Sequence, residues 1–429
     1  MKPDEVAHFS DNVHLLGLFS FHPSGWVREA ALVELEKFDD GNELSYLLIR
    51  ANDWVVPIRN RSWSAIRRRL PTASAEVLVS NIGVIGRLAD KTRLDMTGLL
   101  SDIHGALAAR QESIEIAISS EDFRIRRAGY DIAWKLEEER RVKFIRRGLN
   151  DLDSLIRLRS ATQAAACTDH EVRAELSSLL LSDSWYAVRM KGLYMIIADN
   201  SDQTEFILRK LIHDGARTVR EAARFYLRAS GINNFAQAYR DCLIRREDLV
   251  TDLLGIGECG SVSDAKLVKP YCAHETSRVA SAALTAYAKL TPDEADEVLL
   301  RNLGNRYPSV SNTSRKLLLG RVSGDFAEQV AEIYQDRALE EHIRLNALKL
   351  LMEQGKWIKL IHLLRGVADT SPRIRAYSEH NLDRWRLRYN QSFTQPSEWQ
   401  VSEITKIVTQ LPIRGTSISR FLRSVLHEH

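Results

Sequence analysis

The segment VREAALVEL, residues 27–35, returns almost unchanged as VREAARFYL at residues 219–227. Both follow one nine-residue pattern: a β-branched residue, Arg, two variable positions, a small residue, three variable positions and an apolar residue. The pattern recurs about every 31 residues along nearly the whole chain. Such self-similarity predicts an array of stacked supersecondary units rather than a globular enzyme domain.

The arginine of the pattern, or the residue that replaces it, marks twelve repeats. These markers are Arg28, Arg59, Arg93, Arg126, Arg157, Arg189, Arg220, Val250, Ala280, Ser311, Arg344 and Arg375. Each pattern is expected to form the second helix of a pair, because its β-branched, small and apolar positions lie on one helix face at 3.6 residues per turn. The small residue should let the first helix approach closely. Clear first helices are expected at 172–181, 204–212, 295–303 and 356–364.

In five repeats an aspartate lies six positions before the arginine. The pairs are Asp53/Arg59, Asp151/Arg157, Asp183/Arg189, Asp214/Arg220 and Asp369/Arg375. An aspartate in the turn can cap the second helix. We interpret the arginines as a structural ladder that bonds turn carboxylates or carbonyls, in their own repeat or the next.

These units resemble HEAT repeats. The D-x5-R pairs, the VR-x-x-A core and the segment LGIGECGSVSDAKLVKPYC (254–272) all match that family's pattern, over about residues 15–390. The resemblance implies an all-α fold, a right-handed α-α superhelix of about twelve helical hairpins. Second helices would line a concave groove. HEAT arrays mostly serve as scaffolds and adaptors, a minority bind nucleic acid, and a few are enzymes.

The last part of the chain departs from the repeat. We expect residues 1–390 to form the solenoid and residues 391–429 to form a C-terminal helical cap or a partner-binding tail. Two apolar stripes at helical spacing carry this prediction: Val401, Ile404, Val408 and Leu411, then Ile418, Phe421 or Leu422, and Val425. A cap would cover the open apolar face of the last repeat.

The composition of the chain predicts its cellular compartment and limits the class of partner. The net charge is +3, which is too small to predict long-range electrostatic attraction to an acidic polymer. The four cysteines, Cys167, Cys242, Cys259 and Cys272, have no CxxC spacing and predict a reducing compartment. Acidic residues occupy the place of a signal peptide's positive region, and no apolar run is long enough to span a membrane. The expected location is cytoplasmic.

The sequence assigns no catalytic residue, cofactor or metal. Gly255, Gly257 and Gly260 fit G-x-G-x-x-G, but they lie in a helical repeat, so we interpret them as a left-handed C-cap. The twelve histidines show no zinc-binding spacing. His213 is adjacent to Asp214, which the ladder already uses. A Cys/His or Ser/His/Asp set could still assemble in space without a sequence trace.

Clusters of arginine are the chief functional candidates. Residues 55–160 hold 20 basic and 14 acidic side chains, an excess of six. The candidate phosphate contacts there are Arg68, Arg69, Arg127, Arg146 and Arg147. Near the end of the array, Arg384, Arg386 and Arg388 flank Trp385. The competing interpretation is a set of helix-end cations and mixed-charge solvated faces.

The favoured function is a non-catalytic scaffold that binds a protein partner along the concave face. The candidate partner contacts, expected to be exposed on second helices, are Trp63, Arg67, Arg224 and Arg228. The alternative is a nucleic-acid-binding array centred on residues 55–160. A HEAT-like DNA glycosylase is a remote third, because none of that family's catalytic residues can be placed on this chain.

Overall fold

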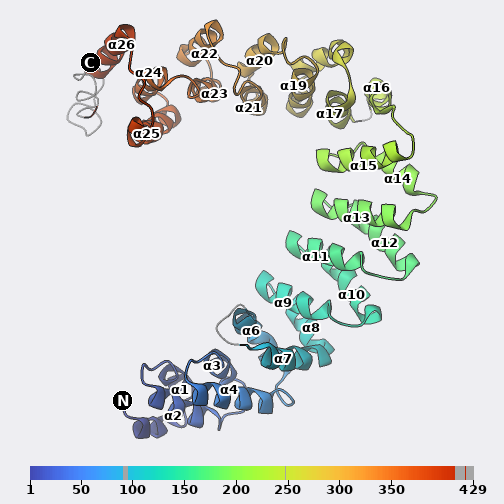
Figure 1. Cartoon of the computed structure of the whole chain (residues 1–429), viewed down its shortest axis with the longest axis vertical. Coiled ribbons are helices and arrows are strands. Elements are labelled where there is room, and N and C mark those ends of the chain that lie inside the picture. Colours follow the sequence, from blue (N-terminus) through green and yellow to red (C-terminus); the bar gives the residue numbers. More distant parts are fainter. Residues whose placement is uncertain (90–94, 247, 411–420, 422–429) are drawn as a thin grey trace. The chain divides into compact units, whose positions relative to one another are not determined.

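The structure, a computed structural model, describes residues 1–89, 95–246, 248–410 and 421. Every regular element within these ranges is a helix. The chain divides into two compact units, Met1–Thr204 and Glu205–His429. Each unit is a HEAT-like stack of helix pairs (Figure 1). No helix in the described ranges is both long enough and apolar enough to cross a membrane.

The N-terminal unit opens on a short 3₁₀ helix, η1 (Pro3–Phe9). Its α-helices are α1 (Val13–Phe19), α2 (Gly25–Leu35), α3 (Leu44–Arg50), α4 (Val56–Arg69), α5 (Ala75–Ser80), α6 (Ile82–Ala89), α7 (Thr97–Ala109), α8 (Gln111–Ile118), α9 (Phe123–Ala133), α10 (Glu138–Leu149), α11 (Ser154–Ala164), α12 (His170–Leu181) and α13 (Tyr186–Asp199).

The C-terminal unit continues the alternation from α14, which begins at the boundary. Its helices are α14 (Thr204–Leu211), α15 (Arg217–Ala229), α16 (Phe235–Arg245), α17 (Leu249–Cys259), η2 (Val262–Asp264), α18 (Ala265–Val268), η3 (Lys269–Ala273), α19 (Ser277–Leu290), α20 (Asp296–Leu303), α21 (Pro308–Leu317), α22 (Asp325–Gln335), α23 (Glu341–Leu351), α24 (Lys356–Val367), α25 (Pro372–Leu387), η4 (Tyr389–Gln391) and α26 (Glu398–Gln410).

The sequence markers locate the second helices. Eleven of the twelve lie near the start of a helix, and ten of these are its fourth residue. Arg93 lies outside the described residues. The four clearest first helices are confirmed as α12, α14, α20 and α24.

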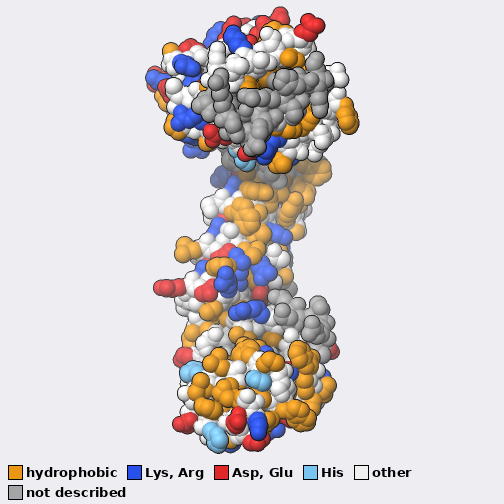
Figure 2. Space-filling view, turned by 90° about the vertical axis from the view of Figure 1, so that its left-hand side faces the viewer, with side chains coloured by type: hydrophobic (Ala, Val, Ile, Leu, Met, Phe, Trp, Pro, Cys, Tyr) orange, Lys and Arg blue, Asp and Glu red, His pale blue; other side chains and the backbone are white. Residues whose placement is uncertain are grey.

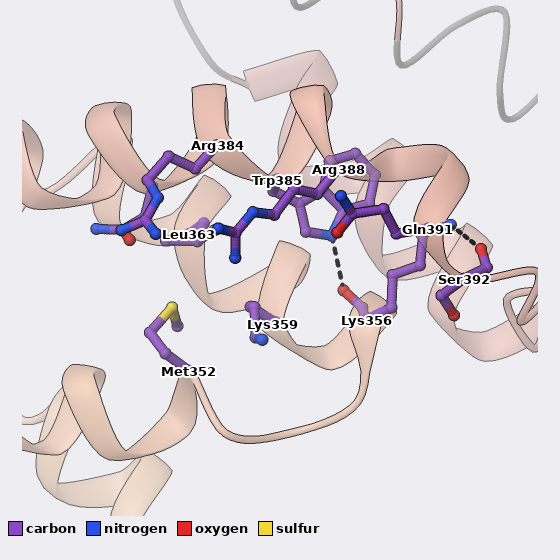
Figure 3. Close-up of a pocket in the computed structure, with 10 residues that line it drawn as sticks. Met352, Lys356, Lys359, Leu363, Arg384, Trp385, Arg388, Gln391 and Ser392 are labelled. Carbon is purple, nitrogen blue, oxygen red and sulfur yellow. Dashed lines mark hydrogen bonds between the residues drawn. The ribbon is translucent and has the colours of Figure 1, made fainter.

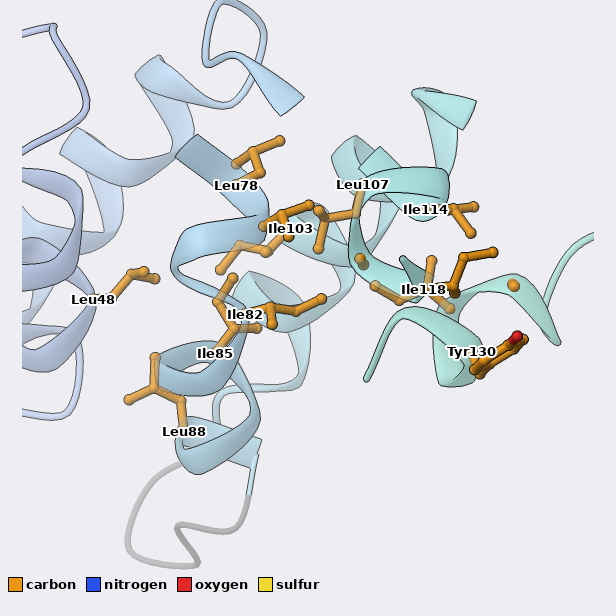
Figure 4. Packing of buried hydrophobic residues seen from close by; sticks show 14 of the residues in the cluster. Leu48, Leu78, Ile82, Ile85, Leu88, Ile103, Leu107, Ile114, Ile118 and Tyr130 are labelled. Carbon is orange, nitrogen blue, oxygen red and sulfur yellow. The ribbon is translucent and has the colours of Figure 1, made fainter. Parts of the chain in front are cut away.

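Small residues of the pattern let paired helices pack closely, as the sequence predicts. A Cβ added at Gly129 of α9 would lie 2.7 Å from Ala117 on α8. One added at Gly192 of α13 would lie 2.9 Å from Leu180 on α12. Aliphatic side chains fill the space between successive pairs, and Figure 4 shows this core from Leu48 to Tyr130.

The arginines of the pattern join consecutive repeats. Arg28 Nη1 donates to the carbonyls of His22 and Pro23, at 3.0 and 2.9 Å, in the turn before its own helix. Its Nε and Nη2 donate to the carboxylate of Asp53, both at 3.0 Å, in the turn of the next repeat. A guanidinium suits this role, because its fork of donors can serve carbonyls and a carboxylate at once.

The same geometry recurs along both units. Arg126 bonds the carbonyls of residues 120 and 121 and the carboxylate of Asp151; Arg157 bonds the carbonyls of residues 151 and 152 and the carboxylate of Asp183; Arg344 bonds the carbonyl of residue 334 and the carboxylate of Asp369. The predicted ladder is therefore confirmed at Arg28, Arg126, Arg157 and Arg344: carbonyls come from the arginine's own repeat and the carboxylate from the next. Among the described residues, Arg59 and Arg375 bond only carbonyls of their own turns.

The role expected for the turn aspartate needs correction. Asp53 Oδ1 accepts the N–H of Val55, which is itself the N-cap residue of α4. Asp369 accepts the N–H of Ser371 in the same way, before α25. The aspartate thus orders the turn that precedes the helix and does not cap the helix. Both of its oxygens also accept from the arginine of the preceding repeat, Arg28 for Asp53 and Arg344 for Asp369.

We expect Arg344→Ala to lower the free energy of unfolding by about 3–5 kcal/mol, because it strands a buried carboxylate. Arg344 and Asp369 have side chains only 6% and 5% exposed. The double variant Arg344→Ala/Asp369→Asn should recover part of that loss, since it removes the buried charge. Urea denaturation followed by tryptophan fluorescence measures both. Arg301→Ala, which breaks a pair of exposed side chains with Glu297 on α20, is the control and should change little. Equal effects of Arg344→Ala and Arg301→Ala would contradict the ladder.

The glycine-rich segment was predicted wrongly in one respect. Gly255 and Gly257 lie inside α17, and Gly260 ends it at φ −78°, so none of the three is left-handed. They serve close packing instead. A Cβ on Gly255 would lie 2.3 Å from the Tyr239 ring, and one on Gly257 would lie 2.5 Å from the Ala286 backbone.

Two glycine substitutions should have opposite effects on stability. Gly257→Ala forces α17 away from α19 and should destabilise the protein by about 1–3 kcal/mol. Gly105→Ala, inside α7 with no atom within 4 Å of the added Cβ, should stabilise it by about 0.5–1 kcal/mol. Chemical denaturation of both variants measures the difference. A stabilised Gly257→Ala would show that the glycine is not needed for this packing.

The C-terminal segment packs on the last repeat. Ile404 and Ile407 of α26 are buried in one cluster with Trp357 and Leu360 of α24. The second predicted stripe lies outside the described residues except for Phe421, whose ring meets Tyr389 edge-on at 5.3 Å. That residues 391–429 act as a cap, rather than as a partner-binding tail, stays a prediction.

Candidate anion-binding pocket

The candidate phosphate contacts of the N-terminal unit all form ion pairs with carboxylates. Arg68 pairs with Glu36, Arg69 with Glu43, Arg127 with Asp153, Arg146 with Glu175 and Arg147 with Glu115. Most of these partners come from a neighbouring repeat. The local excess of arginine is therefore largely balanced in space, which sequence counts along one segment could not show.

Arg69 is structural. Its side chain is 11% exposed and donates to Glu43 and to the carbonyls of Ala65, Glu36 and Phe38. All three nitrogens of the guanidinium thus already donate inside the fold, which leaves little of its donor capacity for a phosphate.

Arg224 is not an exposed second-helix residue, so that expectation is wrong. Its side chain is 3% exposed and pairs with Glu258 at 2.8 Å. It also donates to the hydroxyl of Tyr239 at 2.8 Å. Helix α15 turns this position toward α16 and α17, where the guanidinium is held by the partners that a buried charge requires.

The other three predicted partner contacts are divided between the two units. Trp63 is half-buried and donates its indole N–H to the Ala51 carbonyl. Arg67 is exposed, lies 5.8 Å from the Trp63 ring and pairs with Asp102. Arg228 is exposed on α15 of the other unit, 5.3 Å from the Phe235 ring. Their role in partner binding stays a prediction.

A different basic cluster gathers at the C-terminal end of the array. A pocket of about 440 Å³ lies between α24, α25 and η4 (Figure 3). Its lining residues are Met352, Lys356, Lys359, Leu363, Asn381, Arg384, Trp385, Arg388, Gln391 and Ser392. Four of them are cations and none is acidic. Met352, Leu363 and the Trp385 ring provide an apolar part of the wall.

The cations of the pocket differ from those of the ladder. Within the described part of the chain, Lys359, Arg384 and Arg388 form no ion pair, and the two arginines are exposed. Uncompensated cations that converge on one concavity create a positive potential and attract anions. The pocket can therefore accept a carboxylate or phosphate group.

Lys356 forms part of the pocket wall, and its ammonium group bonds to carbonyls of the protein. Its Nζ donates to the carbonyls of Tyr389 and Ser392, both at 2.8 Å, and lies 3.7 Å from the centre of the Tyr389 ring. Burial lowers the pKa of Lys356 below its usual value. The Lys356 carbonyl in turn accepts the indole N–H of Trp385 at 3.0 Å. These bonds fix η4 and Trp385 against the start of α24.

Part of this pocket had a sequence signal. The arginines that flank Trp385 mark one wall, and Arg384 and Arg388 stand four residues apart on one face of α25 and its end. Lys356 and Lys359 were missed, because they lie in a first helix whose amphipathic stripe explains them without a ligand. Only the pairing of α24 with α25 brings the two sets together.

The surface of the N-terminal unit carries exposed hydrophobic side chains. Figure 2 shows hydrophobic side chains gathered at the end of this unit, the lower end in that view. Large exposed side chains in this unit include Trp26 and Trp54, which are 75% and 69% exposed. Both lie at or next to turns that lead into second helices, α2 and α4.

The chain matches no protein-family model and no curated protein. Among solved structures it is similar to Kap95p, whose binding induces the switch loops of RanGDP to adopt the GTP-bound conformation, with 12% identity and a TM-score of 0.39, over 99% of this chain and 66% of that one. It is also similar to Kap121p alone (11%, TM-score 0.36) and to Kap121p bound to Nup53p (12%, TM-score 0.37), over 100% of this chain and 54% of theirs. The chain thus spans between about half and two thirds of these proteins, and similarity at this level concerns the fold alone.

Helix α24, which forms one wall of the pocket, also holds a pH-sensitive histidine. His362 is 6% exposed and meets the Tyr334 ring at 6.1 Å. Burial, aided by the charge of Arg365, lowers its pKa to about 4. The unfolded chain binds this proton near pH 6.5, so the neutral histidine contributes stability above about pH 6.5 that is lost as the pH falls toward 4.

We therefore expect wild type to lose about 3 kcal/mol more unfolding free energy than His362→Leu between about pH 7 and pH 4. Carboxylates titrate in both proteins and cancel in the comparison. Urea denaturation at a series of pH values gives the two curves. Parallel curves would show that His362 does not carry this pH dependence.

Proposed function

We propose that this protein is a non-catalytic scaffold that binds a protein partner along the face lined by its second helices. Its C-terminal pocket receives an acidic group of that partner. The observation that carries the proposal is the convergence of Lys359, Arg384 and Arg388 on a pocket with no acidic lining residue. Cytoplasmic location, expected from the cysteine pattern, is part of the proposal.

A pre-formed helical surface supports binding of an extended partner, because little of its own conformational entropy is lost. Long-range contacts between helix pairs hold the pocket walls in place before any partner arrives. Exposed tryptophans such as Trp26 and Trp54 are of the residue type that most often dominates protein interfaces. An acidic anchor in the pocket and apolar contacts elsewhere would together give affinity and register.

The pocket can be tested with a labelled oligoglutamate peptide and fluorescence anisotropy. Arg384→Glu/Arg388→Glu should weaken binding at least about ten-fold, because two attractive charges become repulsive. The matched control is Arg301→Glu/Arg306→Glu, which makes the same change in net charge on exposed residues away from the pocket. It should change the affinity less than about two-fold. Equal loss in both variants would mean that the peptide responds to net charge alone.

Nucleic-acid binding through residues 55–160 is the second candidate, and the ion pairs of this region give it less support. A random DNA duplex tested at about 50 and 200 mM salt separates the two functions. Steep salt dependence that survives Arg384→Glu/Arg388→Glu would favour the nucleic-acid function. No detectable binding at the lower salt would eliminate it.

A further inference from the structure

A second polar cluster lies where the ladder is interrupted. In the regular rungs the carboxylate stands 25 or 26 residues after the arginine. For Arg220 those positions are Arg245 and Arg246, and Arg220 pairs instead with Glu258 of α17. Positions 245 and 246 therefore supply no carboxylate to Arg220.

Three side chains with metal-binding atoms meet beside this break. His213 follows α14, Cys242 lies in the last turn of α16 and Asp252 lies in the first turn of α17. The imidazole Nδ1 is 3.1 Å from Asp252 Oδ1, and Nε2 is 3.9 Å from Cys242 Sγ. One ligand atom from each of the three lies within 4.8 Å of the other two.

We propose that His213, Cys242 and Asp252 bind a divalent ion of the zinc class. Imidazole, thiolate and carboxylate are its usual ligands, and tetrahedral zinc spaces such atoms roughly 3.3–3.6 Å apart. One ring nitrogen of His213 would bind the ion, and the ligand atoms, which lie within 4.8 Å of one another, would move closer on binding. A fourth position is left to water or a small ligand, as in three-ligand zinc sites.

The buried carboxylate supplies an independent reason for a cation. The Asp252 side chain is 1% exposed, and its Oδ2 has no hydrogen-bond donor within the described part of the chain. A buried carboxylate oxygen without a donor is costly, and a bound cation offsets this cost. The C-terminal end of α16, where Cys242 lies, also favours positive charge.

The surroundings hold the ligands in place. The His213 ring meets Tyr239 edge-on at 5.2 Å. The Tyr239 hydroxyl donates to the Ile212 carbonyl and accepts from Arg224. Arg245 Nη2 donates to Cys242 Sγ at 3.2 Å. The ion would tie α16 and α17 to the turn before α15.

Cobalt(II) titration of the untagged full-length protein tests the site. One equivalent should give a thiolate-to-cobalt charge-transfer band, and zinc should abolish it. Cys242→Ser should remove the band, and His213→Gln should weaken cobalt binding at least about ten-fold. Cys272→Ser, which removes a buried thiol on η3, is the matched control and should keep the band.

A thermal measurement gives a second readout. Zinc should raise the Tm of wild type and of Cys272→Ser but not that of Cys242→Ser. No charge-transfer band in wild type, or a band that survives Cys242→Ser, would overturn the proposal. Preserved binding of oligoglutamate by Cys242→Ser would show that the pocket between α24 and α25 functions independently of this site.

Discussion

A buried guanidinium that must find a carboxylate in the next repeat is the constraint on which the rest of the fold depends. Arg28, Arg126 and Arg157 each use carbonyls of their own turn and a carboxylate from the following turn, and Arg344 uses the carbonyl of Tyr334 in α22 and the carboxylate of the following turn. The charge cannot be left alone at such low exposure. Consecutive turns are therefore held at one spacing, and the sequence period records that spacing.

The same pairing explains why so many arginines produce so little basic surface. Arg127, Arg146 and Arg147 look like a phosphate-binding series along the chain, yet each meets a carboxylate across a helix or a repeat boundary. What remains after these pairs is more informative than the arginine count. Among the arginines without an ion pair in the described part of the chain, Arg384 and Arg388 line one pocket with Trp385 and Lys359, and they carry the functional proposal.

Most of the fold could be predicted because its determinants are local and periodic. The fourth-residue position of the markers in their helices follows from the pattern itself. The partner of each arginine could not be chosen from sequence, since an aspartate six residues earlier and one 25 residues later recur with the same period. Gly257 was misjudged because glycine permits two things, a left-handed turn and a close approach, and only the position of Ala286 decides between them. The pocket escaped for a related reason: Lys359 and Arg384 come from different helices of one pair.

The interruption of the ladder at Arg220 shows how function could enter a fold that is otherwise repetitive. Regular rungs consume the turn carboxylates, so they leave nothing for a ligand. Here Arg220 of α15 pairs with Glu258 of α17, and Arg224, also of α15, pairs with the same carboxylate. Asp252, in the first turn of α17, faces His213 and Cys242 beside this rung. A repeat that lacks the usual turn carboxylate, but pairs its arginine with another carboxylate, keeps its stability and presents different side chains. On this argument an irregular repeat such as that of Val250, as well as the pocket between α24 and α25, is where the ligand-binding groups of this array should be sought.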